Sequence, residues 1–262
     1  MGSATTQALA TSASALVATK GITVDVAGEL FAVARLVDES VQLSGALADP
    51  SVPAEARAKV AGDVFGTASA PTLEVVRTAV SQRWSNASDL VDGIEELAIR
   101  AAAIASPGED IDGELFGVTR VIAANPELEL ALGSRLGDSA AKGALVDRVL
   151  GTSTGRATSL IVSSLVRHPR ERRVRQLLSR AMGIVAAQRE SVVATVHVAS
   201  SLSAAQQQRL VDALSRRYGT SVSLNVVVDP AVVGGLRVQV ADDVIDGSIS
   251  ARLADLRQKL AG

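Results

Sequence analysis

The chain has 262 residues, 47% of them hydrophobic, so it can bury a sizeable core. Its formal net charge of −2 provides no global field that would attract nucleic acid or an anionic membrane. The absence of cysteine excludes disulfides, thiolate metal sites and cysteine nucleophiles. Aromatic residues make up only 2% of the chain, so small aliphatic side chains must fill the core, which favours closely packed helices.

The first 19 residues carry no charged side chain, but they match neither a signal peptide nor a membrane span. No positive region precedes them, and hydroxyl and amide side chains interrupt them throughout. No later window approaches the roughly 20 apolar residues that are needed to cross a bilayer. We therefore expect a cytoplasmic chain that meets a membrane only indirectly, through partners.

Five helices are predicted in the first part of the chain, from apolar residues at helical spacing and from Gly and Pro at the ends. The first covers residues 4–19, and the second covers residues 24–47 and ends at Asp49-Pro50. The next three cover residues 53–65, 71–83 and 88–105. Trp84, at the end of the fourth helix, is interpreted as a packed cover rather than a platform for a ligand.

The helical pattern starts again near residue 110. Residues 110–116, Asp-Ile-Asp-Gly-Glu-Leu-Phe, repeat residues 25–31, Asp-Val-Ala-Gly-Glu-Leu-Phe, at a shift of 85 positions. At this shift, 13 of the 42 positions over residues 25–66 are identical. We interpret the match as an internal duplication of a helical unit; chance similarity between amphipathic helices is the alternative. The shift places residues 92–105 on residues 7–20, so one helix would close the first unit and open the second.

The second unit continues with helices over residues 156–166 and 171–187, and the pattern changes after Glu190. Beyond it we predict strands over residues 192–199, 222–228 and 232–240, and helices over residues 203–218 and 248–260. The predicted fold is mainly α: an N-terminal helical bundle built from the duplicated unit, followed by a small α+β C-terminal domain. The domain boundaries are residues 1–106, 107–189 and 190–262.

Motifs for catalysis, cofactors and metals are missing. Residues 151–156, Gly-Thr-Ser-Thr-Gly-Arg, hint at a phosphate loop, but they lack its lysine and follow a helix rather than a strand. A helix end followed by a helix start is the preferred interpretation. His168 and His197 have no ligand or catalytic spacing, and the aspartates within residues 242–246 lack the pattern of a calcium loop. We predict no catalytic residue, no cofactor and no metal.

Residues 167–175, Arg-His-Pro-Arg-Glu-Arg-Arg-Val-Arg, form the strongest charge run. Basic runs can bind nucleic acid or acidic partners, but no aromatic residue interleaves this one to stack bases. A solvated helix start is the first interpretation, and contact with an acidic protein partner is the second. We expect no nucleic acid as a partner.

The C-terminal stretch contains a family signature. Val-Gly-Gly-Leu at residues 233–236 is followed by Val-Ile-Asp-Gly-Ser at residues 244–248 and then by Arg252-Leu253. We interpret the Gly pair as a close approach or a bulge near the start of a strand, and Asp246-Gly247-Ser248 as a turn into the last helix. In order and spacing, these elements resemble the signature of the delta subunit of the rotary ATP synthase, a relative of the mitochondrial oligomycin-sensitivity-conferring protein. The signature positions are Gly234, Gly235, Asp246, Gly247, Ser248, Arg252 and Leu253.

The resemblance implies a non-catalytic stator subunit of the proton-translocating ATP synthase, peripheral to the cytoplasmic face of the cell membrane. It implies that the helical bundle binds the N-terminal segment of an alpha subunit and that the C-terminal domain meets the b subunits of the peripheral stalk. We expect Leu253, Leu256 and Leu260 to bury a stripe in the small domain or against the b helices. The alternative is a free-standing helical adaptor that binds acidic partners. The resemblance does not say which helical copy binds alpha.

Overall fold

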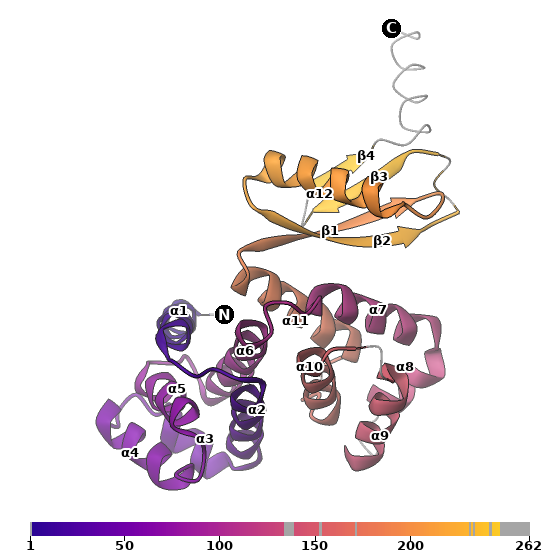
Figure 1. Cartoon of the computed structure of the whole chain (residues 1–262). Coiled ribbons are helices and arrows are strands. Elements are labelled where there is room, and N and C mark those ends of the chain that lie inside the picture. Colours follow the sequence, from indigo (N-terminus) through magenta and orange to yellow (C-terminus); the bar gives the residue numbers. More distant parts are fainter. Residues whose placement is uncertain are drawn as a thin grey trace, which may run out of the picture. The chain divides into compact units, whose positions relative to one another are not determined.

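The computed structural model describes residues 2–133, 139–151, 154–170, 172–230, 232, 234–240 and 243–246. The chain divides into two compact units, Met1–Val185 and Ala186–Gly262. The first consists of helices, and the second combines a small sheet with a helix (Figure 1). The predicted fold class, mainly α with a small α+β domain after it, is confirmed. The division between the units lies within the last helix of the bundle, and the further split at residue 106 stays a prediction.

The central helix of the first unit is α6 (Ala87–Ala105), the longest of the described helices. It contacts α1, α2, α3, α5 and α10, and its side chains Leu90, Ile94 and Leu97 are fully buried. The other helices of this unit are α1 (Ser3–Ala18), α2 (Val24–Glu39), α3 (Val41–Ala48), α4 (Ala54–Val64), α5 (Ala70–Ser81), α7 (Ile111–Ala124), α8 (Pro126–Gly133), α9 (Ser139–Leu150), α10 (Arg156–Arg167) and α11 (Val174–Gln188).

The single helix predicted over residues 24–47 is wrong, because the chain breaks at Ser40. Ser40 has an extended backbone, with φ at −118°, and its hydroxyl accepts a hydrogen bond from the amide of Leu43 at 3.2 Å. It thus ends α2 and caps α3, as serine does at a helix start. The apolar periodicity continues across the break, so spacing alone does not reveal it.

Trp84 is a packed residue, as predicted. It is 2% exposed, and its indole N–H donates a hydrogen bond to the carbonyl of Ala79 at 2.8 Å. Its ring lies over Gly93 of α6, where a side chain would occupy the same space. The glycine therefore lets the largest side chain of the bundle lie directly on the central helix.

The helices of the two predicted copies correspond at the shift of 85. Residues 41–48 of α3 map onto residues 126–133, the span of α8, and residues 70–81 of α5 map onto residues 155–166, close to α10. Residues 3–18 of α1 map onto residues 88–103, within α6. Buried side chains also correspond, including the pairs Leu30 and Leu115, Val37 and Ile122, Leu47 and Leu132, and Val76 and Ile161. The duplication itself stays a prediction.

The glutamate of the repeated Gly-Glu-Leu-Phe block accepts hydrogen bonds from the N-terminus of a later helix at both of its positions. Glu29, on α2, accepts hydrogen bonds from the amide and hydroxyl of Ser69 at 3.1 and 2.5 Å, and from the hydroxyl of Thr72. Glu114, on α7, accepts one from the amide of Gly155 at 3.0 Å. Ser69 and Gly155 are the N-caps of α5 and α10, where a carboxylate satisfies free amides and the helix dipole. The repeated leucine of the block is fully buried in both copies.

The Glu29 contact predicts a defined acid sensitivity. Burial raises the pKa of Glu29, but hydrogen bonds from the Ser69 side chain, from Thr72 and from the Ser69 amide together hold it below its ordinary 4.5. A lowered pKa stabilises the fold above pH 4.5, and this stability is lost as the pH falls through the folded value. We expect Glu29→Gln to cost about 1 kcal/mol at neutral pH and to make unfolding less steeply dependent on pH below about 4.5.

Urea denaturation of the wild type and of Glu29→Gln at neutral pH and at several acidic pH values measures both effects. Glu74→Gln, at an exposed position of α5, is the matched control and should leave both quantities unchanged. Equal losses in the two variants would contradict the assigned role of Glu29.

The second unit is a four-stranded sheet with a helix on one face (Figure 1). Its order is β2 (Ser221–Val228), β1 (Ser191–Val198), β3 (Leu236–Val240), β4 (Asp243–Asp246). The first two strands are parallel and are joined by α12 (Ala204–Tyr218), and the remaining pairs are antiparallel. Its core contains Val196, Leu214 and Val238. Ser203 and Gln206 form a capping box at the start of α12, and Gly219 ends this helix at a φ of 69°.

The strand predicted over residues 232–240 is wrong at its start, because β3 begins only at Leu236. Gly234 and Gly235 precede it with φ of 68° and 79°, in the left-handed region that no strand adopts. Strand β4 was missing from the prediction, which placed its last residue, Asp246, in a turn.

Candidate functional site

The described part of the signature forms one turn and the strand pair that follows it. Gly234 and Gly235 lie in the connection from β2 to β3, and Asp246 lies opposite Arg237 at the end of β4. The other signature positions, Gly247, Ser248, Arg252 and Leu253, fall outside the described residues, as do the predicted contact residues Leu256 and Leu260.

Gly234 and Gly235 lie in a turn of the chain between β2 and β3. The amide of Asp229 donates to the carbonyl of Val198 at 2.8 Å, the amide of Val232 to Asp229 at 3.1 Å, and the amide of Gly234 to Val232 at 2.9 Å. The chain reverses here, so that β3 pairs antiparallel with β1. Left-handed φ at two successive residues favours glycine, which gives the signature a structural reason.

Two amides at the start of α10 are already engaged by carboxylates of the same chain. Gly155 donates its amide to Glu114, and Ala157 donates its amide to Glu109 at 3.0 Å. Gly151 has a φ of 55°, typical of a residue just beyond a helix, and it follows the last residue of α9. The interpretation of residues 151–156 as a helix end followed by a helix start fits these contacts.

The two histidines lie in different units. His168 is partly buried, and burial, followed by the nearby Arg35, holds its pKa below the ordinary 6.5, so that it is neutral at physiological pH. His197, on β1, has its Nδ1 3.7 Å from a carboxylate oxygen of Asp229. Within the described residues, no three His, Asp or Glu side chains cluster in a way that could hold a metal ion.

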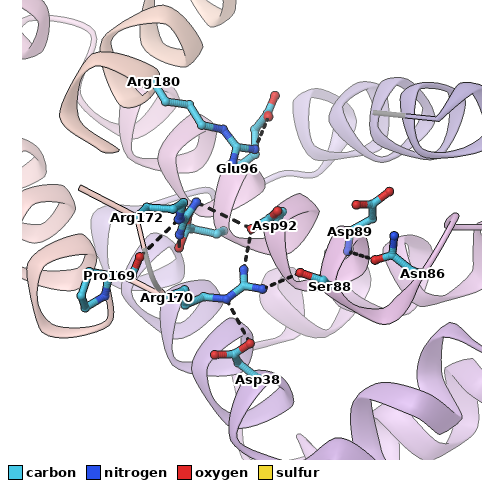
Figure 2. A network of polar contacts seen from close by, with 11 residues as sticks. Asp38, Asn86, Ser88, Asp89, Asp92, Glu96, Pro169, Arg170, Arg172 and Arg180 are labelled. Atoms are coloured by element: carbon cyan, nitrogen blue, oxygen red, sulfur yellow. Dashed lines mark hydrogen bonds and ion pairs between the residues drawn. The ribbon is translucent and has the colours of Figure 1, made fainter. Parts of the chain in front are cut away.

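The basic run 167–175 is largely engaged inside the bundle, which neither interpretation of the sequence anticipates. The guanidinium of Arg170 lies 3.0 Å from Asp38 of α2 and 2.5 Å from Asp92 of α6, and it donates a hydrogen bond to Ser88 at 2.9 Å (Figure 2). Arg170 has a φ of 46°, unusual for a residue other than glycine. One side chain therefore ties the α10–α11 connection to two other helices.

Further arginines extend this contact along the acidic side of α6. Arg172 pairs with Glu95 at 2.8 Å, and Glu96 accepts from both Arg100 and Arg180, at 2.8 and 3.4 Å. Arg175 pairs with Glu129 of α8 at 2.9 Å. We call the set Asp38, Asp92, Glu95, Glu96, Arg170, Arg172 and Arg180 the α6 charge network. The acidic residues of α6 are visible in the sequence, but no local pattern links them to arginines some 80 positions away.

Helix α2 lies along α10 over its whole length. Arg156 and Asp25 pair at 2.5 Å where the two helices begin, and Arg170 and Asp38 pair where they end. Between these pairs, Gly28 faces the side chain of Leu160. A cavity of about 160 Å³ lies between α2, α6 and α10, and its lining includes Phe31, Val91, Glu95, Leu160, Ser163 and His168.

A second hollow lies at the N-terminal end of the bundle. It is lined by Ser3, Ala4, Gln7 and Ala8 of α1 together with Gln82 and Arg83, which follow α5. The lining of α1 has no charged side chain. Within the part of the chain that the structure describes, no helix combines the length and the apolar content that a membrane span requires.

Comparison with known proteins gives a consistent result. The family model "ATP synthase delta (OSCP) subunit" matches residues 97–260. The chain is 46% identical to the ATP synthase subunit delta of Leifsonia xyli subsp. xyli, over the full length of both proteins. It is 42% identical to that of Streptomyces avermitilis, over 91% of this chain and 89% of the relative, and 38% identical to that of Nocardia farcinica, over 94% and 93%.

The family match begins inside α6 and covers the second predicted copy and the C-terminal unit, whereas these relatives align with the first copy as well. The resemblance proposed from residues 233–253 is thereby confirmed. The chain belongs to the ATP synthase delta (OSCP) subunit family, and it is a non-catalytic, structural subunit rather than an enzyme.

Proposed function

We propose that this chain is a stator subunit of the proton-translocating ATP synthase, in the peripheral stalk that links the catalytic head to the membrane sector. It acts at the cytoplasmic face of the cell membrane and resists the torque of the rotor. The observation that carries the proposal is the full-length similarity to ATP synthase delta subunits. The subunit itself makes and breaks no covalent bond.

The bundle has features that suit a component under torque. Its core is dense with Ala, Val and Leu, and tightly packed cores deform little under load. The α6 charge network adds polar ties between α2, α6 and the α10–α11 connection. The side chain of Arg170 is only 16% exposed and that of Glu95 only 10%, so water screens these ion pairs less than it would screen surface pairs.

The proposed partners are the N-terminal segment of an alpha subunit and the b subunits of the stalk. An amphipathic segment binds a helical bundle by laying its apolar face in a groove between helices. The hollow between α1 and the end of α5 is the proposed place for this segment, because Ala4 and Ala8 of α1 leave room there and the α1 side of the hollow is uncharged. For the b subunits we propose the C-terminal stripe of Leu253, Leu256 and Leu260.

A free-standing adaptor that binds acidic partners is less well supported. That function needs the arginines of residues 167–175 on the surface, yet Arg170, Arg172 and Arg175 pair with carboxylates of the same chain. Arg167 and Arg173 are exposed, and two exposed arginines are an ordinary surface feature.

Affinity purification of the tagged chain from its own cells tests the proposal. We expect the alpha and b subunits to co-purify, and we expect cells that lack the chain to lose coupled ATP synthesis. A Leu256→Asp variant should lose the b subunits and retain alpha, with circular dichroism as the check on folding. Fully coupled ATP synthesis without the chain would overturn the stator role.

A further inference from the structure

The correspondence between the two helical copies defines two equivalent grooves. Helices α1 and α5 of the first copy map onto α6 and α10 of the second at the shift of 85. Both pairs are in contact. The groove between α6 and α10 is therefore the counterpart of the groove between α1 and α5.

In the part of the chain that the structure describes, another helix covers the groove of the second copy. Helix α2 lies in it, with ion pairs to α10 and its following connection at both ends, and with Gly28 against Leu160 between them. Under this helix, Val91 and Glu95 of α6 are 2% and 8% exposed. Their counterparts on α1, Thr6 and Ala10, are exposed.

Two ion pairs hold α2 in the groove of the second copy. Asp38 of α2 is held by Arg170, whose counterpart in the first copy is Ser85, and Asp25 is held by Arg156, whose counterpart is Pro71. The first copy therefore lacks both cations that fix α2. It retains the hollow at Gln7 and Gln82, where a helix from another chain has room.

We propose that α2 is a built-in ligand of the second groove, so that the duplicated copy adds no second docking site for the alpha segment. Each chain then binds one segment, in the α1–α5 groove, and the second copy serves as a rigid extension. This inference rests on the proposed function, because the probe is the segment that the proposed function assigns. The occupant it expects is an amphipathic helix with small residues on its packed face, as in α2, where Gly28, Ala32 and Ala34 line the cavity beside α10.

Calorimetric titration of the full chain with a synthetic peptide of the N-terminal segment of the alpha subunit tests the inference. We expect one peptide per chain. Thr78 on α5 and Ser163 on α10 are equivalent positions at the shift of 85 and provide matched variants: Ser163 lines the cavity beside α2, and Thr78 lies one turn before Gln82, which lines the hollow of the first copy. Thr78→Arg should weaken binding by about ten-fold or more, and Ser163→Arg should leave it unchanged.

Two peptides per chain, or loss of binding in Ser163→Arg alone, would overturn the inference and leave the proposed function intact. The complete absence of binding would remove the alpha contact from the proposed function, and this inference with it. Circular dichroism and thermal unfolding establish that both variants are folded, so a change in binding reports on the groove.

A cross-link gives a second, independent test. The chain has no cysteine, so Gly28→Cys with Leu160→Cys introduces the only thiols and allows α2 to be fixed on α10 by a disulfide or a short bifunctional reagent. We expect the linked chain to bind one peptide, with an affinity within about two-fold of that of the unlinked chain. Binding that is lost on linking and restored on release would mean that α2 leaves its groove to admit the segment, and would overturn the inference.

Discussion

Replacing Gly93 with alanine is expected to destabilise the helical unit by about 2–4 kcal/mol, although alanine is the better helix former. A Cβ at this position would overlap the six-membered ring of Trp84, and even the third-nearest ring carbon, Cζ2, would lie only 3.1 Å away. The ring has little freedom to yield, because it is 2% exposed and its N–H is bonded to the carbonyl of Ala79. Urea denaturation followed by circular dichroism measures the loss.

Gly117 provides the control for this substitution. It also lies inside a helix, α7, but a Cβ there would meet nothing within 4 Å. Gly117→Ala is expected to stabilise the chain by about 0.5–1 kcal/mol, through helix propensity and a less flexible unfolded state. Equal effects at the two glycines would show that the Trp84 contact is not what fixes Gly93.

Removal of the buried cation at Arg57 is expected to cost about 3 kcal/mol. Arg57 is 5% exposed, and its guanidinium donates to the carbonyls of Asp49, Ser81 and Gln82 at 2.6, 3.0 and 3.2 Å. Arg57→Met keeps most of the volume but leaves three carbonyls near the ends of α3 and α5 without this donor. Thermal and urea unfolding measure the change in the free energy of unfolding.

The second copy suggests the companion variants for Arg57. Lys142 occupies the equivalent position, at a shift of 85, and is also 5% exposed. Arg57→Lys should therefore keep part of the stability, because a cation is tolerated in this setting. Lys59→Met, on the same helix with a side chain 78% exposed, should change stability by less than about 0.5 kcal/mol. A loss in Arg57→Met as small as that would refute the role of the carbonyl contacts.

Local signals in the sequence located most of the helices. Apolar spacing together with Gly and Pro located α1, α4, α5 and α6 to within a few residues. The same spacing failed at Ser40, where one capping hydroxyl outweighs a continuous apolar stripe. It failed again at β4, a strand of only four residues that pairs with β3. Short elements that are decided by one side chain or by a distant partner leave little trace in periodicity.

The candidate functional residues also differ in whether a local signal or a distant partner determines them. The signature glycines were found by resemblance, and their left-handed backbone explains them only once the turn is seen. The repeat of Glu29 and Glu114 was visible in the sequence, but their capping role depends on helices 40 positions further on. The ion pairs of Arg170 with Asp38 and Asp92 join residues separated by up to 132 positions, so no local sequence pattern predicts them.

Because α6 contacts α1, α2, α3 and α5 before it and α10 after it, a cut on either side of α6 takes it away from one of these two sets of neighbours. A shortened protein that begins at residue 107, or at residue 97 where the family match starts, would lose all or half of the helix on which the remaining ones assemble. A shortened version that keeps α6 whole must begin ahead of Ala87, and the piece left behind would then lack α6, on which its own helices pack.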